Sequence, residues 1–141
     1  MTISTFASGA DSSRRATDAY RPGVCNIGPA EIARRRTAGH VGMIATVVVL
    51  AILILIGAPL VTRLLAILPA AASASGYLQA WLKFCAGFGS RGSFNFGALG
   101  EASTVVDDEA RGMDRRRARQ ISIWALAIGV VVGVVAVLLP V

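Results

Sequence analysis

The chain has 141 residues, of which 55% are hydrophobic and 16% charged, and it carries a formal net charge of +6. Its mean hydropathy of +0.64 lies outside the usual range for a soluble domain of this length and indicates a small membrane protein. The arginines stand beside apolar runs and not among aromatic residues, so the positive charge favours anionic lipid head groups over nucleic acid as a partner.

Residues 1–23 are rich in Ser, Thr, Ala and Asp and contain no apolar run long enough for a signal peptide. Their low apolar content predicts a disordered N-terminal tail, and residues 24–141 then form a single membrane domain. Pro29 follows a glycine and Glu31 comes two residues later, as in the first turn of a helix. We therefore expect a short interfacial helix over 29–37.

Three arginines end this interfacial helix immediately before the first apolar run: Arg34, Arg35 and Arg36. Basic residues in this position typically anchor a membrane span to the head groups on its cytoplasmic side. A specific site for an anionic lipid or a phosphate is the alternative interpretation.

Three apolar runs predict transmembrane helices over about 41–58, 64–82 and 121–139. Between the first two runs, Gly57 and Pro59 interrupt the helical pattern and Arg63 follows. A tight turn at the far face of the membrane is expected there, because a single kinked helix would bury Arg63 in lipid. The predicted fold is an all-α integral membrane protein with three transmembrane helices.

Small residues recur at every fourth position in the second and third runs, a spacing that lets another helix approach closely. These helix-packing residues are Ala72, Gly76 and Ala80 in the second run and Ala125, Gly129 and Gly133 in the third. The helix that packs there can belong to a second copy, to another protein or to the same chain.

The segment between the second and third runs divides into a loop and a charged helix. The stretch KFCAGFGSRGSFNFG combines glycines with phenylalanines and predicts a cytoplasmic loop, interfacial or re-entrant, whose phenylalanines dip into the membrane surface. After it, Thr104 is the expected cap of a helix whose acidic residues, Asp114 among them, lie on a solvated face and whose arginines come last. Four of these arginines are expected to meet lipid head groups: Arg115, Arg116, Arg117 and Arg119.

The positions of the basic residues predict an orientation. Of the 14 Lys and Arg residues, all except Arg63 lie before the first run or between the second and third. The positive-inside rule then places the N-terminus and the central loop in the cytoplasm and the C-terminus in the periplasm, for a protein of the cell inner membrane.

Three side chains with metal-binding or redox chemistry fall on the cytoplasmic side in this topology: Cys25, Cys85 and His40. They could bind a metal or exchange with a disulfide, although a structural zinc site normally takes four ligands and the chain has no CxxC motif. Reduced, packed cysteines are one alternative, and lipidated cysteines are another. The chain also lacks HExxH and GxSxG motifs, which predicts a protein that is not an enzyme and has no cofactor.

Two motifs, CNIGPAEIARRR and FCAGFGSRGSFNFG, resemble those of a group of small bacterial inner-membrane proteins with no assigned activity. In that group a CN-I-G-x-x-E-I-x-x-R motif precedes two apolar segments and an FNFG loop. The first motif more distantly resembles the start of the transmembrane domain of inner-membrane rhodaneses, although those proteins have two spans and this chain has no rhodanese loop. The resemblance implies a bacterial inner-membrane protein over about residues 24–141.

These observations predict a non-enzymatic inner-membrane protein that acts through helix packing, as a homo-oligomer or as an accessory subunit of a larger membrane complex. The first alternative is a thiol or metal site at the cytoplasmic face. The second is lipid binding or transport of a small solute.

Overall fold

The computed structural model describes residues 14, 15 and 17–141, so residues 1–13 and 16 of the predicted tail lie outside the described part. The described elements, in chain order, are α2 (Pro29–Leu55), η1 (Leu60–Ala66), α3 (Ile67–Leu82), α4 (Ala86–Arg91), β1 (Ser93–Phe94), β2 (Ser103–Thr104) and α5 (Asp108–Leu138). Three helical segments are long and apolar enough to cross a membrane: Pro29–Leu55, Leu60–Leu82 and Asp108–Leu138. The prediction of three such segments is confirmed.

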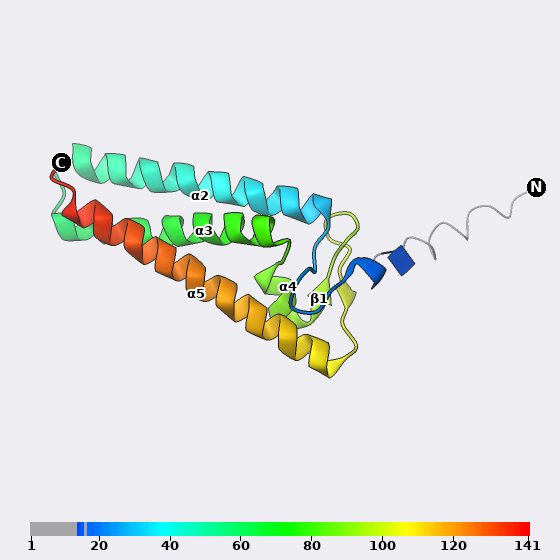
Figure 1. Cartoon of the computed structure of the whole chain (residues 1–141). Helices are drawn as coiled ribbons and strands as arrows, with labels where there is room; N and C mark the ends of the chain where they lie inside the picture. The colour runs from blue at the N-terminus through cyan, green and yellow to red at the C-terminus, as the bar shows by residue number, and fades with distance from the viewer. Residues whose placement is uncertain (1–13, 16) are drawn as a thin grey trace, which may run out of the picture.

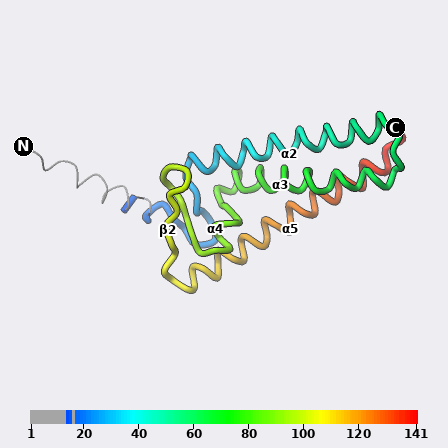
Figure 2. Tube along the Cα trace, turned by 180° about the vertical axis from the view of Figure 1, so that it is seen from behind, coloured from blue at the N-terminus to red at the C-terminus, as the bar shows by residue number. Residues whose placement is uncertain are grey.

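The three long helical segments are arranged with α3 in the middle. It packs along α2 on one side and α5 on the other, while the start of α5 diverges from the start of α2 (Figure 1). Seen from behind, the short elements α4 and β2 lie together at this diverging end, opposite the C-terminus (Figure 2). We call the residues that fill this end, 20–28 and 84–105, the cap.

The predicted interfacial helix and the first span are one continuous helix, α2. The prediction placed a break between residues 37 and 41, but no residue in that interval ends the helix. Thr37 donates a hydrogen bond back to the carbonyl of Ala33 at 3.1 Å, and Gly39 is buried against Tyr77 of α3. Packing at Gly39 therefore offsets the low helix propensity of glycine.

The turn at the far end follows the prediction, but Arg63 does not lie on the surface. Gly57 adopts a φ of +65°, a left-handed conformation that favours glycine, and Pro59 precedes η1. Arg63 is only 4% exposed and donates hydrogen bonds to the carbonyls of Ala136 and Leu139, each at 3.0 Å, and to that of Val141. A guanidinium thus satisfies the carbonyls that the end of α5 leaves without helical partners.

The cap differs most from the predicted loop. Phe84 and Phe94 are buried inside the protein and do not project outward as expected for residues that dip into a membrane. Phe94 stacks on Tyr20 with ring centroids 4.8 Å apart, and its backbone pairs with Ser103 in a short antiparallel sheet that an all-α prediction did not include. Phe84 belongs to a buried hydrophobic cluster with Ala118 and Ile121, and Phe94 belongs to a second one with Val105 and Ala110.

The charged helix continues into the third span as α5, but its N-cap residue is Asp107 and not Thr104. The Asp107 side chain accepts a hydrogen bond from the backbone N–H of Ala110 at 3.1 Å. Thr104 lies in β2 and pairs with Ser93 of β1, so it precedes the helix and does not cap it. An acidic N-cap residue also interacts favourably with the positive end of the helix dipole.

Candidate functional site

A network of buried polar side chains holds the cap on the helices. Asn26 is fully buried and exchanges two hydrogen bonds with the backbone of Cys85, donating to its carbonyl at 3.1 Å and accepting from its N–H at 2.7 Å. The backbone carbonyl of Asn26 also accepts from the N–H of Asn95 at 2.9 Å. Two asparagines therefore join the segment before α2 to both halves of the segment between α3 and α5.

An acidic side chain is buried beside this network. Glu31, in the first turn of α2, is 1% exposed, and its Oε1 accepts a hydrogen bond from the side chain of Asn95 at 3.4 Å. Its Oε2 lies 3.6 Å from Nη2 of Arg35, which also donates to the sulfur of Cys85 at 2.9 Å. Because a buried carboxylate is costly without a partner, the Arg35 guanidinium keeps Glu31 compatible with the interior.

A second buried acid fastens the residues before α2 to α5. Asp114 is fully buried, accepting from the hydroxyl of Tyr20 at 2.6 Å and from the backbone N–H of Gly23 at 2.7 Å. Burial, and then the hydrogen bond and charge of Asp114, raise the pKa of Tyr20, so its hydroxyl stays protonated and continues to donate. The expectation that Asp114 lies on a solvated face is wrong.

The structure does not bring Cys25, Cys85 and His40 together. Cys25 donates weakly to the carbonyl of Ile27 at 3.8 Å, Cys85 is 1% exposed against Arg35, and Nδ1 of His40 lies 2.5 Å from the Tyr77 hydroxyl. Across residues 14–15 and 17–141, no three His, Cys, Asp or Glu side chains form a group that could hold a metal ion. Each side chain has a different partner: a backbone carbonyl for Cys25, the Arg35 guanidinium for Cys85 and the Tyr77 hydroxyl for His40.

The small residues of α5 pack within the chain. A Cβ added at Gly129 would lie 2.7 Å from the Cβ of Ala71 and 2.9 Å from the carbonyl oxygen of Ile67, and one added at Gly133 would collide with the Ile67 side chain. Ala125 is also buried on this helix. The predicted small-residue face of α5 thus meets α3 of the same chain.

The small residues of α3 divide between two surroundings. A Cβ added at Gly76 would lie 2.5 Å from the backbone nitrogen of Gly39, so α2 and α3 approach each other closely at this pair. Ala80 is buried, whereas Ala72 is exposed. Of the three residues at this four-residue spacing, Gly76 and Ala80 are therefore buried inside the protein and Ala72 lies on its outer surface.

Five of the seven arginines expected at head groups are exposed, and two are partly enclosed. Arg34, Arg36, Arg115, Arg116 and Arg119 lie on the surface of the end that carries the cap. Arg35 contacts Glu31 and Cys85 as described, and Arg117 lines a groove of about 300 Å³ between α3 and α5 with Trp81 and Trp124.

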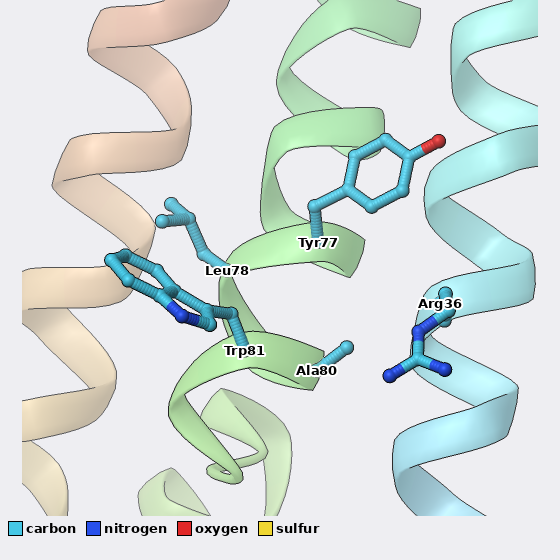
Figure 3. A pocket seen from close by; sticks show the side chains of 5 residues that line it. All are labelled: Arg36, Tyr77, Leu78, Ala80 and Trp81. Carbon is cyan, nitrogen blue, oxygen red and sulfur yellow. The ribbon is translucent and has the colours of Figure 1, made fainter.

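A second groove, of about 370 Å³, lies where the start of α2 meets the end of α3. Arg36 extends from α2 toward α3, Tyr77 and Ala80 project from α3 toward α2, and Trp81 lies on the side of α3 nearer α5 (Figure 3). Trp81 is 79% exposed, an unusual position for a large aromatic side chain unless lipid or another molecule covers it. The groove combines one cation with an otherwise apolar lining.

A third groove runs over α3, which is recessed between its two neighbours. Its floor includes Ala70 and Ala74 of α3, and its walls include Val47 of α2 and Ile128 of α5, with a volume of about 310 Å³. The hydroxyl groups nearby are used internally, since Ser73 donates to the carbonyl of Gly39 at 2.8 Å. A partner that enters this groove would therefore meet an apolar surface and could approach the backbone of α3 closely at Ala70 and Ala74.

Comparison of the chain with protein-family models, with curated proteins and with solved structures finds no match. The geometry of the grooves and of the buried polar network is therefore the basis for any function. Sequence reasoning missed the buried roles of Asn26, Asn95 and Asp114. Asn26 and Asn95 lie in the motifs CNIGPAEIARRR and FCAGFGSRGSFNFG, but nothing in the sequence indicates which residues they contact.

Proposed function

We propose that this protein is a non-enzymatic, multi-pass membrane protein that binds a transmembrane helix of a partner, as a homo-oligomer or as an accessory subunit of a larger membrane complex. The observation that supports this proposal is the groove over α3 with its floor of small side chains. Small side chains let a helix backbone approach closely, and such contacts are the main source of helix association in lipid. An acyl chain gains no comparable advantage from them.

The position of the groove fits this proposal better than the small-residue faces predicted from sequence. Gly76, Gly129 and Gly133 contact other helices of the same chain and leave no room for a further helix. By contrast, only 11% of the apolar stretch of α2 is buried inside the protein, against 28% for α5. The open side of α2 thus forms one wall of the surface at which a partner helix would dock.

A matched pair of substitutions on α2 tests this function. Val47 is 62% exposed and lines the groove, whereas its neighbour Val48 is 48% exposed and does not line it. We expect Val47→Trp to fill the groove and abolish co-purification of the partner, or self-association, in mild detergent, with Val48→Trp retaining both. The measurement is the native mass of the purified complex.

Two results would contradict this function. One is a monomer without any partner in native mass measurements of the unaltered protein over a range of mild detergents. The other is equal association of the Val47→Trp and Val48→Trp variants, which would place the contact elsewhere.

We propose that the cap lies in the cytoplasm of a bacterial cell and that the far end of α5 lies outside the inner membrane. Support comes from the arginines, since those of α2 and α5 are at the end that carries the cap and Arg63 alone is at the other. A reporter fused after Val141 is expected to be active in the periplasm. A cytoplasmic signal from that fusion would reverse the orientation.

A further inference from the structure

We propose that the groove between the start of α2 and the end of α3 binds an anionic phospholipid, with its phosphate at Arg36 and an acyl chain across Ala80 and Trp81. This site shares Tyr77 with the groove over α3 proposed for a partner helix, but its other lining residues are different. It turns a general attraction between arginines and head groups into one defined position.

Among the residues that the structure describes, Arg36 differs from its two neighbours in having no protein partner. Its neighbours Arg34 and Arg35 both reach the carboxylate of Glu31, at 3.9 and 3.6 Å. Arg36 extends toward α3 (Figure 3) and, within the described residues, forms no hydrogen bond or ion pair. An exposed guanidinium that faces a groove and lacks a protein partner complements a phosphate, which it can bind through two parallel hydrogen bonds.

The rest of the groove is lined mainly by apolar side chains. Arg36 is its single charged lining residue, and the other lining side chains are Tyr77, Leu78, Ala80 and Trp81. Trp81 presents most of its indole outward, at the level where α3 ends and the chain leaves the apolar segment. One cation at the edge of an apolar surface matches an amphiphile whose charged end is next to its hydrocarbon chain.

The charge of the groove favours anionic over zwitterionic lipids. The Tyr77 hydroxyl already contacts Nδ1 of His40, and none of the described side chains that line the groove carries a carboxylate for a positively charged head group. The ammonium group of a zwitterionic lipid would lie near Arg36 and be repelled by it. A head group with net negative charge avoids this repulsion, so the groove should prefer anionic over zwitterionic phospholipid.

Quenching of Trp81 by brominated lipids tests the site. The chain has 2 tryptophans, so Trp124→Phe leaves Trp81 as the only one. The protein is reconstituted in phosphatidylcholine vesicles that contain a small fraction of brominated phosphatidylglycerol or, in parallel, the same fraction of brominated phosphatidylcholine. We expect the anionic quencher to quench Trp81 more strongly.

Two variants in the same background separate a site from general attraction. Arg36→Gln should lower the preference for the anionic quencher about fivefold, the effect of one cation near a lipid surface, and Arg36→Lys should retain most of it. Arg91→Gln removes the same charge from α4, outside the groove, and should leave the preference at Trp81 unchanged. Circular dichroism checks that each variant keeps its helical content.

Three outcomes would overturn the proposal. Equal quenching by the two brominated lipids would show no preference, and equal losses in Arg36→Gln and Arg91→Gln would show nonspecific attraction. Loss of the preference on addition of inorganic phosphate would show that Arg36 takes the free anion and not the lipid.

Discussion

The contact between α3 and α5 can be tested by the same substitution at two glycines of one helix. Gly129 and Gly112 both lie in α5, but a Cβ at Gly129 would be 2.9 Å from the backbone nitrogen of Ala71, whereas a Cβ at Gly112 has nothing within 4 Å. Gly129→Ala should therefore destabilise the protein and Gly112→Ala should stabilise it. The pair isolates packing, because both variants gain the same helix propensity.

The expected magnitudes follow from two opposing effects. Replacing a helical glycine by alanine favours the helix by about 1 kcal/mol, and overpacking a close contact costs about 1–3 kcal/mol. The atoms that a Cβ at Gly129 meets include backbone of α3, which cannot rotate away, so the cost should be near the upper end of that range. We expect the free energies of unfolding of the two variants to differ by about 3 kcal/mol, with Gly129→Ala the less stable.

Equilibrium unfolding in mixed detergent micelles, followed by helical circular dichroism, measures this difference. Adding Ala71→Gly to Gly129→Ala removes the nearest side-chain atom, 2.7 Å from the new Cβ, and should restore part of the lost stability. Equal stability of Gly129→Ala and Gly112→Ala would refute the close packing of α5 on α3.

Three further predictions concern other parts of the fold. Arg63→Gln should lower the free energy of unfolding by about 2 kcal/mol, because charged hydrogen bonds to the end of α5 are lost; unchanged hydrogen exchange over residues 136–139 would contradict this role. In the native protein, maleimide should label the half-buried Cys25 before Cys85, whereas the Asn26→Ala variant should expose Cys85, and equal labelling rates in the unaltered protein would mean that the cap is open. The raised pKa of Tyr20 favours its neutral form in the folded state, so the stability it contributes is complete below the ordinary tyrosine pKa of about 10 and is lost as the pH rises through the raised value. At a pH of about 10, ultraviolet difference spectra against Tyr20→Phe should therefore show little phenolate at Tyr20 in the folded protein and about half ionisation in the denatured protein.

The long helices were predictable because each depends on a local property. An apolar run without charge and of sufficient length identifies a membrane-spanning segment whatever it packs against. Gly57 and Pro59 likewise mark the turn between α2 and η1 through backbone preferences alone. The packing partners of Gly129 and Gly133 were not predictable, since small residues at this spacing suit a helix of the same chain as well as one of another protein.

The cap could not be predicted, because it depends on contacts between residues far apart in the sequence. Asn26 and Cys85 are separated by 59 positions, and Tyr20 and Asp114 by 94. A polar residue is normally placed on the surface when a sequence is analysed, and only a partner supplied by tertiary structure makes its burial favourable. Arg63 follows the same rule, since its carbonyl partners belong to the other end of the chain.

The bond between Tyr20 and Asp114 sets the order in which the protein can assemble during synthesis. Tyr20 and Gly23 emerge from the ribosome long before their acceptor, so the residues ahead of α2 wait without it until α5 has been made. Contacts between such distant positions form late in folding. A nascent chain arrested after α3 should therefore be cleaved by added protease between residues 20 and 28, and become resistant there once α5 is released.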